Sequence, residues 1–71
     1  MAFEITVPMA GKIVSIQVEP GASVDENDTI ATLEALKMEI PVLTKRSGIV
    51  KEITVEPGED VDADAVIAII D

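Results

Sequence analysis

Several short stretches of the chain alternate between apolar and polar residues or are almost wholly apolar. Alternation with a two-residue period is typical of a half-buried strand, and short apolar runs are consistent with strands as well. These stretches are residues 3–7, 16–18, 29–33, 53–55 and 66–70. The most helix-friendly stretch, residues 32–39, is shorter than a stable helix usually requires. The pattern therefore predicts an all-β fold.

The chain also contains an internal repeat. Residues 11–34 (GKIVSIQVEPGASVDENDTIATLE) and residues 48–71 (GIVKEITVEPGEDVDADAVIAIID) align without gaps at an offset of 37, with ten identities in 24 positions. A shared Val-Glu-Pro-Gly in one register indicates two copies of one supersecondary unit. Two such β units most simply pack as two small sheets face to face. We therefore predict a flattened barrel with quasi-twofold symmetry, formed by a single domain over residues 1–71.

Each copy of the repeat contains a predicted turn. Residues 19–21 and 56–58 both read Glu-Pro-Gly. Proline presets φ at the first central position of a turn, and glycine tolerates a positive φ at the second. We therefore expect a type II turn in each copy.

The repeat gives Lys37 a special position. Adding or subtracting the offset of 37 gives positions 74 or 0, which lie just beyond the two chain ends. One end of the barrel should therefore hold both termini, and the other end the turn around Lys37. This turn is the predicted tip of a hairpin that runs from Ile30 to Val42. The four-carbon stem of a lysine at such a tip extends the reach of any group attached to it.

Apolar residues flank Lys37 on both sides. A tight exposed turn usually favours Gly, Asn or Asp, whereas this one carries Leu36 and Met38. The pair indicates a surface for docking a partner. Two plainer interpretations stay open: Lys37 is an ordinary solvated lysine, or Leu36 and Met38 fold inward as core residues.

The composition excludes most kinds of catalysis. The chain has 71 residues, of which 48% are hydrophobic, and it has neither histidine nor cysteine. No Ser-His-Asp or Cys-His arrangement can form, and no imidazole or thiolate can bind a metal. Catalysis by paired carboxylates needs a cleft, which we do not expect in so small a domain. We therefore expect no catalytic residue and no metal site, and the chain is interpreted as a partner or substrate of enzymes.

The charge balance excludes two further classes of partner. The formal net charge is −9, whereas binding to nucleic acid or to an anionic membrane requires a basic surface. The first residues lack the charged and apolar regions of a signal peptide, and no apolar run is long enough to span a membrane. We therefore expect a cytoplasmic protein that does not insert into membranes.

The segment EALKMEI, from Glu34 to Ile40, resembles the biotin attachment motif Glu-Ala-Met-Lys-Met-Glu of biotinyl (biotin carboxyl carrier) domains. PMAGKIVSIQVEPGASV before the motif and RSGIVKEITVEPGEDV after it also resemble this family. Residues 8–11 match its Pro-Met-x-Gly element, and residues 47–48 match its Ser-Gly element. The resemblance covers nearly the whole chain. It implies a flattened barrel of two four-stranded antiparallel sheets, with the modified lysine on an exposed hairpin.

The resemblance also implies the site residues. Lys37 matches the biotinylated lysine, and Glu34, Ala35, Met38 and Glu39 match the neighbours that the ligase and other partners recognise. Position 36 is leucine where the family usually has methionine. Because this exchange nearly conserves volume, we expect biotin attachment to survive it.

The function implied by the resemblance is that of a carrier rather than an enzyme. A biotin–protein ligase acylates the lysine, a biotin carboxylase carboxylates the tethered biotin, and a carboxyltransferase or decarboxylase receives the carboxyl group. The absence of a linker and of an inserted thumb implies a stand-alone domain. A lipoyl carrier, which shares the fold, is the nearest alternative, although lipoyl domains usually carry Asp-Lys-Ala at the tip. An unmodified structural barrel is the second alternative.

Overall fold

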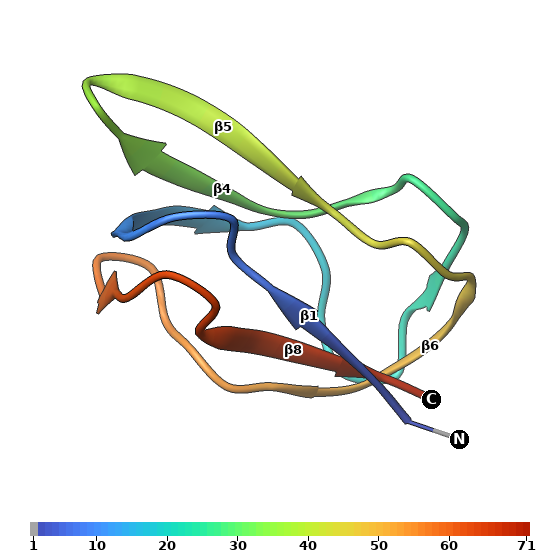
Figure 1. Cartoon of the computed structure of the whole chain (residues 1–71). Helices are drawn as coiled ribbons and strands as arrows, with labels where there is room; N and C mark the ends of the chain where they lie inside the picture. The colour runs from blue at the N-terminus through green and yellow to red at the C-terminus, as the bar shows by residue number, and fades with distance from the viewer. Residues whose placement is uncertain (1) are drawn as a thin grey trace.

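The structure is a computed structural model that describes residues 2–71, and its regular elements are eight strands (Figure 1). Residues 2–71 include no helix of the length and hydrophobicity that a membrane crossing requires. The all-β prediction is confirmed. The strands are β1 (Phe3–Thr6), β2 (Gly11–Ile16), β3 (Ser23–Val24), β4 (Thr29–Ala35), β5 (Met38–Leu43), β6 (Gly48–Ile53), β7 (Asp60–Val61) and β8 (Val66–Ile70).

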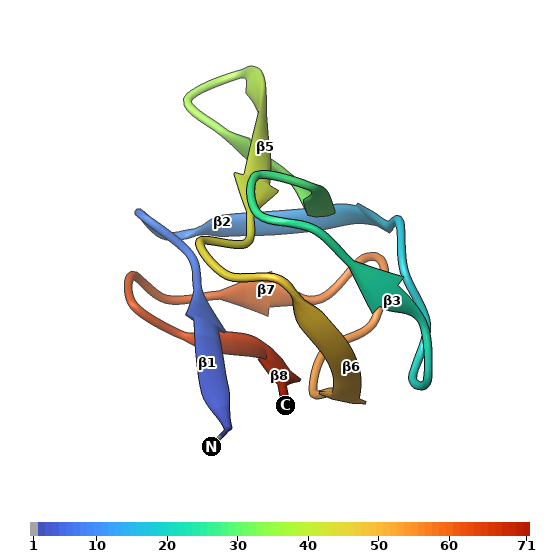
Figure 2. The same ribbon diagram turned by 90° about the vertical axis from the view of Figure 1, so that its right-hand side faces the viewer.

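The strands form two four-stranded antiparallel sheets with the orders β1-β8-β6-β3 and β5-β4-β2-β7. An offset of 37 residues converts the first order into the second, strand by strand, so the predicted quasi-twofold symmetry is confirmed. In each sheet the two central strands come from one half of the chain (β1–β4 or β5–β8) and the two outer strands from the other half. Figure 2 shows the short strands β3 and β7 beside β6 and β2. Neither repeat therefore completes a sheet by itself.

The symmetry extends to the irregular backbone. The ladder irregularity between Ile13 and Ser15 in β2 recurs between Val50 and Glu52 in β6. The predicted Glu-Pro-Gly turns are confirmed: Gly21 and Gly58 have φ of 93° and 90°. The N–H of the following residue donates to the glutamate carbonyl in both turns, at 3.0 and 3.1 Å. Such a turn requires a positive φ at its third residue, which glycine adopts without strain.

Three of the five predicted strands are confirmed or nearly so, as β1, β4 and β8, but the strands near the other two stretches lie earlier in the chain. The alternating residues 16–18 and 53–55 begin at the last residues of β2 and β6 and continue into the turns. Their strand prediction is wrong because the ladders end where the chain bends toward each Glu-Pro-Gly turn. The N–H groups of Gln17 and Thr54 still donate to carbonyl groups of the neighbouring strand in the same sheet, β4 and β8 respectively, at 2.9 and 3.0 Å. This contact explains why the alternation continues past the end of the strand.

The core lies between the sheets and is aliphatic. Its most deeply buried large side chains include Ile13, Ile30, Leu33 and Ile67, each no more than 1% exposed. Burial of such a side chain contributes about 1.5–3 kcal/mol. Phe3 is half-buried and packs against this cluster from the edge. The core is therefore built from aliphatic, mostly β-branched side chains and contains no fully buried aromatic ring.

The loop after β5 is fixed to β1 at the end of the barrel that holds the termini. The buried Thr44 hydroxyl donates to the carbonyl of Arg46 at 2.7 Å and accepts from its N–H at 3.2 Å. The Arg46 guanidinium carbon lies 4.9 Å from the centroid of the Phe3 ring. A cation over an aromatic face is attracted by the ring quadrupole. The two hydrogen bonds thus fix the loop internally, and the contact of Arg46 with Phe3 connects it to β1.

Gly11 is required where β2 approaches β4. A Cβ atom at this position meets the Glu34 carbonyl oxygen, with Leu33 Cδ1 at 3.1 Å and Ala35 Cβ at 3.2 Å. A Cβ at its symmetry equivalent Gly48 lies 2.7 Å from the Asp71 carbonyl oxygen. The two glycines thus allow each central strand pair to approach closely.

We predict that Gly11→Ala lowers the free energy of unfolding by about 2–3 kcal/mol, because backbone atoms of β4 must move to admit the methyl group. Urea denaturation followed by circular dichroism measures the change. Gly58→Ala is the matched control, since it meets no atom within 4 Å and only its φ of +90° opposes it. We expect that control to cost about 1 kcal/mol. Equal losses in the two variants would contradict the steric account.

Candidate functional site

The hairpin of β4 and β5 projects from the barrel at the end opposite both chain termini (Figure 1). Its strands pair from Leu33 with Ile40 through Glu34 with Glu39 to Ala35 with Met38. Leu36 and Lys37 form the two-residue connection. The structure therefore places Lys37 at the tip of the predicted hairpin, and the termini lie where the repeat predicted them.

The turn at this tip holds two non-glycine residues in the left-handed region. Leu36 has φ of 53° and Lys37 has φ of 63°. Two positive φ values in a two-residue connection define a type I′ turn, whose twist matches that of the flanking strands. Asn-Gly or Asp-Gly normally occupies it, because other side chains pay roughly 1–2 kcal/mol per residue there. Strain of this kind persists where the surrounding structure enforces it and is concentrated at functional sites.

The hairpin has two chemically different faces. Residues directly opposite in a ladder share a face, so Met38 lies on the same side of the sheet as Ala35 and the core residue Leu33. Ala35 is 6% exposed, whereas Met38 is 64% exposed and Leu36 at the tip is 84% exposed. The inner face of the hairpin thus continues past the core with the exposed Met38. Leu36 is exposed at the tip beside Lys37, and we refer to Leu36 and Met38 together as the apolar ledge. The interpretation of these two residues as core residues is wrong.

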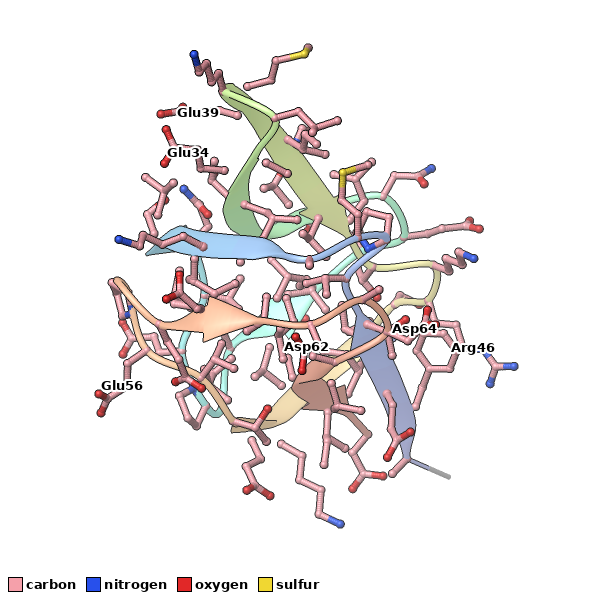
Figure 3. The ribbon with its side chains drawn as sticks, turned by 60° about the vertical axis from the view of Figure 1, so that its left-hand side comes forward. Glu34, Glu39, Arg46, Glu56, Asp62 and Asp64 are labelled. Carbon is pink, nitrogen blue, oxygen red and sulfur yellow. The ribbon has the colours of Figure 1, made fainter. Side chains whose placement is uncertain are left out.

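The outer face of the hairpin is acidic. Glu34 and Glu39 lie directly opposite each other, and both side chains point to the same side of the hairpin (Figure 3). Like charges at this spacing destabilise a sheet. Nothing in the ladder relieves Glu39, because β5 is an edge strand and Glu34 is its only cross-strand neighbour. The fold therefore keeps an unfavourable pair within three residues of Lys37.

This pair belongs to a charged row that crosses the whole sheet. Lys12 lies between Asp60 and Glu34, so its charge offsets those two carboxylates. In the order β7, β2, β4, β5 the row consists of Asp60, Lys12, Glu34 and Glu39. The equivalent positions of the other sheet are Ser23, Ile49, Asp71 and Ala2, of which only one is charged. The two sheets therefore differ in charge at this row.

The structure thus brings the predicted site residues together on one hairpin. All of them except Ala35 are exposed, and Ala35 anchors the base of the turn. The residues are Glu34, Ala35, Leu36, Lys37, Met38 and Glu39. Sequence reasoning did not include Lys12 and Asp60 in this neighbourhood. The sequence signal for Lys12 was a difference between the two copies of the repeat: the first copy has lysine at residue 12, whereas the second has isoleucine at the equivalent residue 49.

A shallow groove lies elsewhere, along the seam between the edge strands β1 and β5. Its volume is about 370 Å³, and Glu4, Lys45 and Asp64 contribute charged groups to a lining that also includes Phe3 and Leu43. None of the hairpin-tip residues lines it.

Within residues 2–71, no three His, Cys, Asp or Glu side chains lie close enough together to hold a metal ion.

Residues 3–70 match the model of the Biotin_lipoyl family, which is described as "Biotin-requiring enzyme". The chain belongs to this family. The match spans both repeats and the hairpin, and the predicted resemblance to this family is thereby confirmed. The fold is confirmed as well. The crystal structure of the Kluyveromyces lactis urea carboxylase superposes with a TM-score of 0.93 at 27% identity, over 99% of this chain and 6% of that one.

Two curated relatives are similar in sequence. The biotin/lipoyl attachment protein of Bacillus subtilis (strain 168) is 40% identical over 47 residues, which is 66% of this chain and 64% of that protein. The biotin-dependent acyl-coenzyme A carboxylase alpha3 subunit of Mycobacterium leprae is 41% identical over 46 residues, 65% of this chain and 8% of that subunit. The matches therefore span less than two thirds of each relative's length.

We predict that Leu36→Asn stabilises the chain by about 1 kcal/mol, because asparagine tolerates the left-handed conformation better than leucine does. Little burial is lost, since Leu36 is 84% exposed. The midpoint of urea unfolding measures the effect. Leu43→Asn, on the same hairpin but in the ladder, is the control and should not stabilise the chain. A lower midpoint for the Leu36 variant would show that its side chain contributes packing that outweighs the strain.

Proposed function

We propose that this chain is a biotin carrier whose Lys37 side chain is acylated by a biotin–protein ligase. The observation that carries the proposal is the position of Lys37 at a strained two-residue tip, clear of the barrel and flanked by exposed apolar residues. A structural hairpin has no need of this turn sequence, since Asn-Gly closes it at lower cost. Membership in a biotin-requiring family supports biotin as the attached group.

Lys37 fits such a group chemically. Its ε-amine is the nucleophile: the nitrogen attacks the carbonyl carbon of biotinyl-AMP, an amide C–N bond forms, AMP leaves and the amine loses a proton. Lys37 is exposed at the tip of a hairpin that projects from the barrel, which leaves its amine open to a ligase (Figure 1). When bound, biotin supplies a ureido nitrogen that accepts a carboxyl group.

The barrel then acts as a rigid handle for a flexible arm. Tethering converts each transfer into an intramolecular event with a high effective concentration. In this proposal the catalytic groups belong to the partners, a biotin carboxylase and a carboxyltransferase or decarboxylase, and the chain contributes none. The M. leprae relative, which is a subunit of a biotin-dependent carboxylase, supports partners of this class. The descriptions of family and relatives give the lipoyl alternative no separate support.

The two faces of the hairpin are proposed to guide recognition. The apolar ledge of Leu36 and Met38 offers area that a partner can cover, and Ala35 keeps the turn seated on the core. The carboxylates of Glu34 and Glu39 repel each other in the free chain. A cationic group of the ligase relieves that repulsion on binding, which favours the complex over the free protein.

We predict that a biotin–protein ligase adds one biotinyl group to the wild-type chain and none to Lys37→Arg, because the guanidinium group is not a nucleophile under these conditions. Intact-mass spectrometry after incubation with ligase, biotin and ATP provides the measurement. Lys51→Arg is the matched control: Lys51 is exposed on β6, in the other sheet, and this variant should be biotinylated normally.

The same experiment with a lipoate ligase separates the two carriers. A Lys37-dependent lipoyl adduct without a biotinyl adduct would assign the chain to lipoyl carriers instead. If neither ligase modifies the wild-type chain, the carrier proposal is wrong and an unmodified structural barrel remains.

We predict that Glu39→Gln slows biotinylation by about tenfold, because a charge that faces a cationic partner is lost from the contact. The same change should leave the midpoint of urea unfolding unchanged or raise it, since it removes a like-charge pair. Initial rates of biotin incorporation and urea denaturation test the two parts. Glu52→Gln on β6 serves as the control and should change neither the rate of biotinylation nor the midpoint of urea unfolding. A loss of rate together with a loss of stability would point to a structural role for Glu39.

A further inference from the structure

The chain has a second reactive side chain beside Lys37, the thioether of Met38. With no cysteine in the sequence, methionine supplies all of its sulfur. Met38 is 64% exposed, whereas Met9 is partly buried and packs against the core. Oxidation of methionine requires access of the oxidant to sulfur, so the two side chains differ in the property that controls the reaction.

The exposure of Met38 follows from the shape of the hairpin. Its side chain lies on the core-facing side of the sheet, opposite Ala35, but at a level where the core has ended. The other flank of Lys37 is occupied by Leu36, whose hydrocarbon side chain has no sulfur to oxidise. Oxidative chemistry at the tip is therefore confined to one residue.

We propose that Met38 is an oxidation site for hydroperoxides, and that its sulfoxide slows the acylation of Lys37. A sulfur lone pair attacks the peroxide oxygen, an S–O bond forms and the O–O bond breaks. The sulfur is oxidised to the sulfoxide, and hydrogen peroxide is reduced to water. Methionine sulfoxide reductases reverse the change, so the modification is not a terminal lesion.

The consequence for Lys37 rests on the proposed carrier function. An enzyme that acylates Lys37 must cover the residues next to it, including the ledge of Leu36 and Met38. The sulfoxide oxygen is a strong hydrogen-bond acceptor, and burying it without a donor carries a desolvation penalty. Oxidation therefore replaces the apolar contact between Met38 and the enzyme with a contact to a polar sulfoxide, which loses its hydration when the enzyme binds.

The first test measures the site of oxidation. The full-length chain is treated with increasing hydrogen peroxide, and sulfoxide at residues 1, 9 and 38 is quantified by peptide mapping. We expect Met38 to be oxidised at least about tenfold faster than Met9, in line with their exposure. Equal rates at Met38 and Met9 would overturn the proposal.

The second test measures the effect on Lys37. Biotinylation rates by a biotin–protein ligase are compared before and after peroxide treatment, for the wild-type chain and for Met38→Leu. We expect the treated wild type to be about five- to tenfold slower than the untreated one, and methionine sulfoxide reductase to restore its rate. In Met38→Leu the treated and untreated rates should agree, whatever their absolute value.

The outcomes separate this inference from the carrier proposal. If the untreated wild type is not biotinylated, the carrier function itself fails. If it is biotinylated, but at the same rate with and without sulfoxide at Met38, the carrier function stands and the effect of oxidation is refuted. A peroxide-induced loss that persists in Met38→Leu would assign the effect to another residue and would equally refute the inference.

Discussion

The exchange of outer strands between the two halves of the chain is the constraint on which the rest of the structure depends. Each sheet has two central strands from one half (β1–β4 or β5–β8) and two outer strands from the other. The Gly21 N–H donates to the Val50 carbonyl at 2.8 Å, and the equivalent Gly58 N–H donates to the Ile13 carbonyl at 2.6 Å. The turn of each repeat is therefore held by a strand of the other. A small aliphatic core is enough for this chain because neither half can open without disrupting both sheets.

The strained hairpin tip is possible because this framework is closed. The ladder between β4 and β5 fixes the register on both sides of the turn, from Leu33 and Ile40 to Ala35 and Met38. Leu36 and Lys37 are thereby held with positive φ values although neither residue favours them. The stability of the barrel thus supports a local conformation that presents Lys37 in a defined direction.

Much of this arrangement was predictable because the repeat is visible in the sequence. The offset of 37 was sufficient to place Lys37 at a hairpin tip opposite the termini, without any side-chain geometry. The strands at residues 16–18 and 53–55 were misplaced because alternation does not show where hydrogen bonding stops. The two-residue strands β3 and β7 were not foreseen, since periodicity has no meaning over two positions. The positive φ of Leu36 and the charged row through Lys12 depend on cross-strand register, which the sequence does not specify directly.

The position of the chain ends has a consequence for how such a domain is built into larger proteins. Phe3 and Ile70 are ladder partners, so the polypeptide enters and leaves the barrel at one point. The hairpin lies at the other end of a molecule whose longest dimension is 32 Å. Insertion into a host polypeptide therefore needs only one attachment region and leaves the opposite pole unobstructed. In the urea carboxylase of K. lactis the matching region is 6% of the chain, as expected for a module that can be transplanted without changing its hairpin.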